Sequence, residues 1–393
     1  MKRIALLLIL LIAATPSAVA APKPVAVKKL TIIATVNAES IVASGKTIVT
    51  VSNTDGLKSN ILLTGMDING VQLWQKTIDS GTDEVALASA SDPAGNIWLA
   101  GASSLPPTTE STTAPIQAEN PDGVIVEPVT KLRGDMNLLT LWKVSPLGDL
   151  LGTYTLVQSA PALINAISVN SSGISIVGQL EDKNFLVSAN SMGAFGKVIS
   201  IGTSKTQLNA VVRNSDGSVS VFGSSAEALA GKKLAGTRDG VLIKVSKAGT
   251  VATVVRSSAP KAQRSWLASD PSLALTGFVK TGKTIETAFT KFTSAFAPTW
   301  TLRVPSLGNS VVTAAGSSTY GALSSSAAVK GLSGWKPTMP SVLLLVCDGK
   351  GVITSAYGSS EISDPIALVN SKDLGVVGLA RTSTQTVSLF TLS

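Results

Sequence analysis

The chain repeats one pattern of apolar and polar positions. A short apolar run meets a turn of Gly, Asp, Asn or Ser, a second apolar run ends in Gly, and two further strand-like runs follow. The clearest copy spans residues 91–101, and weaker copies span residues 170–178 and 214–223. Runs this short with turn residues between them are typical of β-strands. A repeat of this length indicates one supersecondary unit copied along the chain.

Each unit reads as four short strands. In the first unit, residues 41–52 supply two strands, and residues 60–67 and 71–78 supply the third and fourth. Asn69-Gly70 separates the last two, and Asn-Gly between apolar runs is a strong hairpin signal because both residues tolerate positive φ. Further units begin near residues 83, 161, 205, 261 and 307.

The seventh unit, residues 366–392, contains only three strands before the chain ends. Residues 27–36 form a strand-like run that has no unit of its own. If this run supplies the missing strand, the two ends share one sheet and close a ring that leaves only short edges. The sequence therefore predicts an all-β fold, a seven-bladed β-propeller of four-stranded antiparallel blades, closed by an N-terminal strand that completes the last blade. Six or eight blades and a linear β-solenoid are the alternatives.

Two segments carry a resemblance to a known family. Residues 92–101 (DPAGNIWLAG) and 69–74 (NGVQLW) resemble the secreted bacterial β-propeller repeat proteins. The resemblance implies a seven-bladed propeller outside the cytoplasm, and it implies no particular chemistry.

The N-terminus has the features of a secretory signal peptide. Lys2 and Arg3 precede an apolar stretch over residues 4–14, and Ala18-Val19-Ala20 is a small-x-small cleavage site. We therefore expect residues 1–20 to be removed, residues 21–393 to form a single domain, and the protein to be secreted, periplasmic or on the cell surface. A retained N-terminal anchor is the alternative. The longest later apolar run, residues 342–347, suits a buried strand and predicts no transmembrane segment.

Composition excludes several kinds of chemistry. The chain has no His, which excludes Ser-His-Asp triads and His metal sites, and its one Cys, Cys347, is expected to be a small buried hydrophobe. No cofactor is expected. The net charge is +8, and removal of Lys2 and Arg3 leaves +6. No basic run accompanies aromatic residues, so nucleic acid is not an expected partner. Trp74 and Trp300 stand at equivalent places in their units and are expected to pack between blades.

Three long insertions interrupt the repeat, at residues 103–137, 224–240 and 324–341. Each lies between the second and third strands of its unit, in units two, four and six, so all three are expected on one face of the ring. Long loops on a rigid scaffold are where binding usually occurs. The candidate binding residues in these loops are, in chain order, Arg133, Lys232, Lys233, Arg238, Asp239, Lys330, Trp335 and Lys336.

Trp335 beside Lys336 is expected to be exposed, where it could stack on or anchor a partner. The alternative is that Trp335 pins its loop to its own blade. The sequence thus predicts an exported, non-enzymatic, monomeric binding scaffold whose partner is an envelope or extracellular protein or polysaccharide. One alternative is a glycan-processing hydrolase or lyase with carboxylates and an Arg in a central pocket. The other is a structural component of a cell-envelope assembly.

Overall fold

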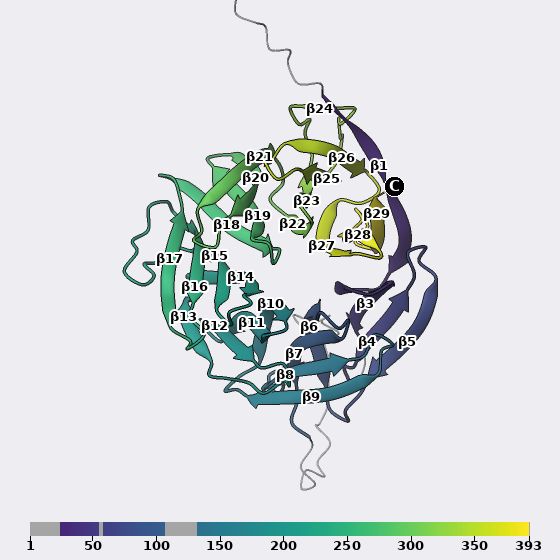
Figure 1. Ribbon diagram of the computed structural model, residues 1–393, viewed down its shortest axis with the longest axis vertical. Helices are drawn as coiled ribbons and strands as arrows, with labels where there is room; N and C mark the ends of the chain where they lie inside the picture. Colours follow the sequence, from purple (N-terminus) through teal and green to yellow (C-terminus); the bar gives the residue numbers. More distant parts are fainter. Residues whose placement is uncertain (1–23, 55–57, 107–131, 393) are drawn as a thin grey trace, which may run out of the picture.

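The computed structural model describes residues 24–54, 58–106 and 132–392, and every regular element in these ranges is a β-strand. Figure 1 shows the strands arranged as blades around a central opening. No helix in the described ranges is long and apolar enough to cross a membrane. The predicted signal peptide at residues 1–20 lies outside these ranges, so it stays a prediction.

Five blades are separate four-stranded antiparallel sheets, and each is built from four strands consecutive in the chain. Within each of these blades the strands follow one another outward in chain order. The first strand lines the channel and the fourth lies at the rim (Figure 1). The strands of blades one to three are β2 (Ser40–Ser44), β3 (Thr47–Asn53), β4 (Ile61–Met66), β5 (Gln72–Ile78), β6 (Glu84–Ser91), β7 (Ile97–Ser103), β8 (Leu138–Val144), β9 (Leu150–Val157), β10 (Ala162–Asn170), β11 (Gly173–Leu180), β12 (Lys183–Ala189) and β13 (Ile199–Thr203).

Blades four and five follow the same order. Their strands are β14 (Thr206–Arg213), β15 (Val219–Ser225), β16 (Asp239–Val245), β17 (Val251–Ser257), β18 (Ala262–Ser269), β19 (Ala274–Thr281), β20 (Thr284–Phe292) and β21 (Pro298–Pro305).

Blades six and seven are joined into one nine-stranded sheet by the N-terminal strand β1 (Val25–Val36). The other strands of this sheet are β22 (Ser310–Ala315), β23 (Ser318–Ser325), β24 (Leu332–Ser333), β25 (Ser341–Cys347), β26 (Ile353–Ser359), β27 (Asp364–Ser371), β28 (Gly375–Arg381) and β29 (Val387–Leu392).

The second half of β1 pairs antiparallel with β29, from Leu30 opposite Leu392 to Val36 opposite Val387. The prediction that the N-terminal segment completes the seventh blade is therefore confirmed. The sequence did not predict the first half of β1, where Val27–Lys29 pair in parallel with β26 and Val25 and Ala26 pair with β24. One strand thus holds two blades together at the place where the ring closes.

The apolar core lies between neighbouring blades. All seven residues of β7, β15 and β25 are buried, whereas the outer strand β9 alternates between exposed and half-buried positions. The seventh blade packs on the first, because Val377, Leu379 and Leu389 share an apolar cluster with Ile41 and Ile48. Burial of both faces of each sheet supplies the main favourable free energy of folding.

Trp74 and Trp300 pack between blades, as predicted. A Cβ added to Gly148, in the last turn of blade two, would lie 2.6 Å from the ring of Trp74 in blade one. A Cβ added to Gly351 of blade six would likewise lie 2.7 Å from the ring of Trp300 in blade five. Cys347 is 2% exposed, and burial raises the pKa of its thiol to about 12, which confirms its role as a buried apolar residue.

Candidate binding face

The described residues of the three insertions lie at the same end of their blades as the connections between blades. In blade two, the Arg133 guanidinium contacts Asp83 of the β5–β6 connection, with 2.6 Å between Nη2 and Oδ2. In blade four, Glu227 accepts a hydrogen bond from the N–H of Thr203, next to the β13–β14 connection, at 2.7 Å. In blade six, Ser324 accepts one from the N–H of Leu307 in the β21–β22 connection, at 2.9 Å. These contacts bring described residues of all three insertions to one end of the ring, which we call the loop face.

The opposite end of the ring carries tight turns. In blade two, one carboxylate oxygen of Asp92 accepts hydrogen bonds from the N–H groups of Ala94 and Asn96, both at 2.9 Å. Asp348 makes the same two contacts in blade six, to Lys350 and Val352. Such turns satisfy their own backbone groups and can stay short. The long loops lie at the other end of the ring, on the loop face.

In the first insertion, most of the segment, residues 107–131, lies outside the described residues. Arg133 is partly exposed and contacts two carboxylates, Asp83 at 2.6 Å and Asp135 at 2.9 Å. The guanidinium holds the pKa of Asp83 below its usual range. Two acidic partners offset the positive charge of Arg133, which makes it a weaker candidate for an anionic partner than an unpaired Lys.

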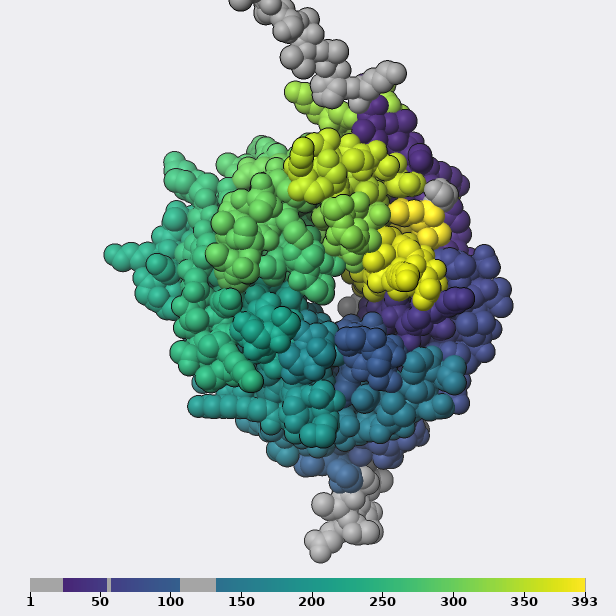
Figure 2. Space-filling view, viewed as in Figure 1, coloured from purple at the N-terminus to yellow at the C-terminus, as the bar shows by residue number. Residues whose placement is uncertain are grey.

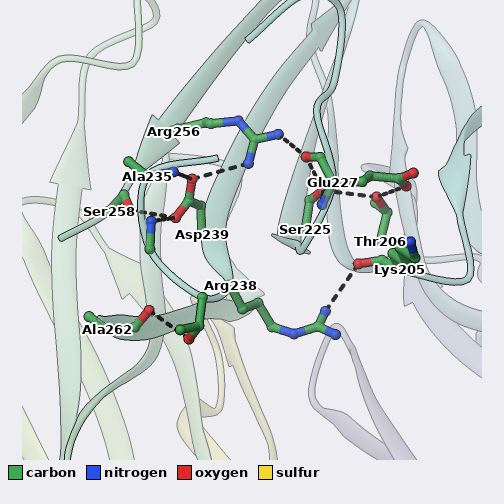
Figure 3. Close-up of polar contacts among 12 residues, drawn as sticks. Lys205, Thr206, Ser225, Glu227, Ala235, Arg238, Asp239, Arg256, Ser258 and Ala262 are labelled. Atoms are coloured by element: carbon green, nitrogen blue, oxygen red, sulfur yellow. Dashed lines mark hydrogen bonds and ion pairs between the residues drawn. The ribbon is translucent and has the colours of Figure 1, made fainter. Parts of the chain in front are cut away.

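In the second insertion, Asp239 is the centre of a buried polar network (Figure 3). Its carboxylate accepts hydrogen bonds from the N–H groups of Ala235 and Gly236 at 3.0 and 2.8 Å, and from the Ser258 hydroxyl. Arg256 contacts it at 3.1 Å. Burial pushes the pKa of Asp239 upward, but these hydrogen bonds outweigh burial and lower it from its usual value. The carboxylate therefore stays charged and fixes the end of the loop.

The same insertion links three blades. Arg256 also donates a hydrogen bond to the carbonyl of Glu227, whose carboxylate accepts one from the Thr206 hydroxyl at 2.6 Å. Arg238 donates to the Lys205 carbonyl at 3.3 Å, and its own carbonyl accepts from the N–H of Arg264 in blade five at 2.9 Å. Residues 226–238 are thus held on both sides, as Figure 3 shows for the side toward Lys205.

In the third insertion, the expectation that Trp335 is exposed is wrong. Trp335 is 9% exposed, its Nε1 lies 3.3 Å from the Ser325 hydroxyl, and it belongs to an apolar cluster with Val25 and Val27 of β1. A Cβ on Gly358 would lie 2.1 Å from the ring, so the indole rests directly on β26. The alternative, in which Trp335 pins its loop, describes the structure. Figure 1 shows β24 of this loop beside the start of β1 at the rim.

Apart from Arg133, described above, the candidate residues fall into two groups. Asp239 and Trp335 are buried and Arg238 is half-buried, so these three side chains support the loops. Lys232, Lys233, Lys330 and Lys336 are exposed, and none of their ammonium groups forms an ion pair within the described residues. Sequence reasoning missed Arg256 and Glu227. Arg256 directly follows the mostly apolar run 251–255, and a charge buried beside such a run requires a partner.

The central channel bears on the catalytic alternative. Figure 2 shows that the channel is open at the centre of the ring. Near the loop face it forms a cavity of about 520 Å³ lined by the first strands of the blades. Asn165 and Asn209 donate hydrogen bonds to backbone carbonyls of the next blade, both at 2.8 Å. Glu39 is the one carboxylate among the described residues that line this cavity, and no Arg lines it. Within the described chain, no group of Cys, Asp and Glu side chains is placed to hold a metal ion.

Comparisons with known proteins identify the fold. No family model matches the sequence, and no curated protein matches it. The putative 6-phosphogluconolactonase from Bacteroides uniformis ATCC 8492 aligns over 89% of this chain and 96% of its own, with a TM-score of 0.53 and 8% identity. The β-propeller domain of the Trilobed protease from Pyrococcus furiosus aligns over 92% and 94%, with a TM-score of 0.49 and 10% identity. The fold is a β-propeller. At these identities the likeness shows the fold alone.

Proposed function

We propose that this protein is an exported, non-enzymatic scaffold that binds an acidic polymer of the cell envelope or its surroundings through the loop face. The partner is a polysaccharide or an acidic protein. The observation that carries the proposal is the contrast between anchored loops and free charges on that face. Buried contacts of Asp239 and Trp335 hold two of the loops, while four lysines on them stay exposed.

The anchoring contacts reduce the entropic cost of binding. A loop already held by a buried ion pair or a buried indole loses little freedom when a partner binds. The exposed Lys232, Lys233, Lys330 and Lys336 then present positive charge from preorganised positions. Long-range attraction of this kind raises the association rate with an anionic partner and weakens as salt is added.

The channel supports binding over catalysis. A carboxylate pair with an adjacent Arg would favour a glycan-processing enzyme. The described lining of the channel at the loop face holds Glu39 without a second carboxylate and without an Arg. Export itself rests on the N-terminal sequence of residues 1–20. Its test is whether the secreted or periplasmic fraction contains a chain that starts at Ala21.

The binding test compares two variants of equal charge on the two faces. The first replaces Lys232, Lys233, Lys330 and Lys336 with Gln. The control replaces four exposed lysines in the tight turns at the opposite end of the ring, Lys46, Lys197, Lys247 and Lys350, with Gln. Retention on immobilised polygalacturonate, an acidic polysaccharide, and on an immobilised polyglutamate peptide is measured as a function of salt.

We expect the loop-face variant to elute at clearly lower salt than both the wild type and the control on at least one matrix. The matrix that shows the difference identifies the class of partner. Equal retention of the two variants would contradict the role of the loop face, and absence of retention on both matrices would contradict an acidic partner.

A further inference from the structure

A cavity between blades four and five has no part in the proposed function. Its volume is about 170 Å³. Blade four contributes Leu242, Val255, Arg256 and Ser257, and blade five contributes side chains from all four of its strands. The cavity lies within the inter-blade core, away from the exposed lysines of the loop face.

The cavity exists because blade five departs from the packing of the preceding blades. In blades two to five, the first strand has a β-bulge, and the residue before it pairs with a Gly of the second strand. These glycines are Gly101, Gly178, Gly223 and Gly277. A Cβ on Gly277 would lie 1.9 Å from the Ser265 carbonyl oxygen, so the bulge requires Gly there.

The next residue across the sheet, in the third strand, differs between the blades. It is Thr140 in blade two, Phe185 in blade three and Val241 in blade four, whereas in blade five it is Ala288. Gly277 and Ala288 are therefore adjacent small residues on the face that blade five turns toward blade four. They leave space that a larger third-strand side chain fills in the other blades.

The walls of this cavity are mostly apolar and aromatic. Trp266, Phe292 and Phe296 are at most 7% exposed, and the rings of Trp266 and Phe292 meet edge to face at a centroid distance of 5.4 Å. Pro298 and Arg303 are exposed, which places them at the mouth. An apolar cavity of about 150 Å³ accommodates a benzene ring, so this one is large enough for a compact apolar group.

Three arginines line the cavity. The Arg256 guanidinium is engaged by Asp239 and by the Glu227 carbonyl, which leaves Arg264 and Arg303 for a ligand. Arg264 is half-buried, its Nη1 donates to the Ser257 hydroxyl at 3.0 Å, and its Nε is buried without a partner among the described residues. It forms no ion pair with a described residue. Arg303 contacts Glu286 at 3.6 Å, which is longer than a hydrogen bond. Burial and the nearby Arg303 lower the pKa of Arg264, so the two cations together favour an anion between them.

We propose that this cavity binds a small carboxylic acid anion with a compact apolar body, of the size of benzoate or hexanoate. The apolar body lies over Gly277 and Ala288, against Trp266 and Phe292. The carboxylate lies toward the mouth and accepts hydrogen bonds from Arg264 and Arg303. A pocket of apolar walls with a few convergent polar groups is typical of small-molecule sites, and a carboxylate is the anion that a guanidinium binds in two-point geometry.

The experiment uses the mature protein and para-fluorobenzoate, observed by fluorine NMR. The neutral probe para-fluorobenzyl alcohol has the same ring. We expect para-fluorobenzoate to bind and the alcohol to bind at least about tenfold more weakly, because the alcohol cannot pair with the guanidinium groups. Absence of binding by para-fluorobenzoate at millimolar concentration, or equal binding of the two probes, would overturn the proposal.

Two variants locate the site. Arg264→Met removes one cation and keeps the length of the side chain, and Ala288→Leu fills the cavity and keeps both cations. Each is expected to weaken binding of para-fluorobenzoate by at least about tenfold. Arg381→Met, at an exposed Arg of blade seven, is the matched control and should bind like the wild type. If both site variants bind like the control, the anion binds elsewhere and the assignment is wrong.

Discussion

Arg256 in blade four and Arg303 in blade five occupy equivalent positions in the propeller. Each stands in the fourth strand, opposite the third-strand residue next to the Gly that the bulge requires. Arg256 has an 8% exposed side chain, contacts a fully buried carboxylate, and stands opposite Val241. Arg303 has a 41% exposed side chain, contacts a partly exposed Glu286, and stands opposite Ala288.

The difference shows how one scaffold position serves two purposes. In blade four, the loop that ends at Asp239 covers the guanidinium and neutralises it, so Arg256 fastens a loop to the rim. In blade five, no long loop follows the second strand, since β19 and β20 are joined by a tight turn at residues 282–283. Arg303 therefore stays at the mouth of a cavity. The neighbours, and not the residue type, decide whether the charge stabilises the fold or is available to a ligand.

The largest effect is expected from Asp239→Ala. The substitution leaves the Arg256 guanidinium buried without its carboxylate, and breaking a buried pair in this way costs about 3–5 kcal/mol of the free energy of unfolding. Thermal and urea unfolding measure the loss. Asp364→Ala is the control, because its ion-pair partner Arg381 is 3.9 Å away and exposed, and its hydrogen bond from Asn309 is also exposed. Similar losses for the two variants would show that the Asp239 network is not a special anchor.

A smaller effect is expected when each Arg is replaced by Met, which keeps most of the apolar stem. Arg256→Met leaves Asp239 with its hydrogen bonds from Ser258, Ala235 and Gly236, so we expect a loss of about 2 kcal/mol. Arg303→Met removes only a partly exposed pair and should cost less than about 1 kcal/mol. Urea unfolding of both variants is the measurement, and an equal cost would contradict the comparison.

Substitutions of the third-strand residues Val241 and Ala288 are expected to change the free energy of unfolding in opposite directions. Val241→Ala removes two methyl groups from a fully buried site and should destabilise the fold by about 2 kcal/mol. Ala288→Val adds the same groups where a cavity lies, and should stabilise the protein by up to about 1 kcal/mol. Unfolding midpoints measure both. A loss of stability in Ala288→Val would show that the cavity walls cannot accept the added volume.

The smallest effect concerns pH. The pKa of Asp239 is lower in the folded protein than its usual value, so its contribution to stability is full above about pH 4 and is lost as the pH falls further. Asp239→Asn lacks this titration. The free energy of unfolding of that variant should therefore fall less steeply with acid than that of the wild type or of the exposed Asp373→Asn control. Parallel acid dependence in all three proteins would mean that the carboxylate titrates normally.

Much of the fold could be predicted from the sequence because short, local residue patterns specify its turns and strands. Asn69-Gly70 and the residues around Gly95 specify turns, and alternating apolar runs specify strands. The count of strands left one blade incomplete, and residues 27–36 were the only unassigned run. The pairing of Val27–Lys29 with β26 could not be predicted, since no local signal tells a strand that it will have partners in two blades.

The candidate site was predicted less well. The sequence located the three insertions and the exposed lysines, because insertion length and charge are visible along the chain. It misplaced Trp335, since whether an indole in a loop is exposed depends on a small residue elsewhere, here Gly358 of β26. It also missed the pairing of Asp239 with Arg256, which depends on where the loop 226–238 returns to the blade.

The sequence by itself determined the repeat, the all-β class, the closure by the N-terminal strand and the end of the ring that carries the long loops. These properties follow from periodicity and turn chemistry, which act over a few residues. Only the tertiary structure decided which charges are paired and where space is left between blades. Those properties depend on side chains that meet across blade interfaces, such as Ala288 facing Leu242 and Val255. Such residues are far apart along the chain, and no local pattern in the sequence marks their contact.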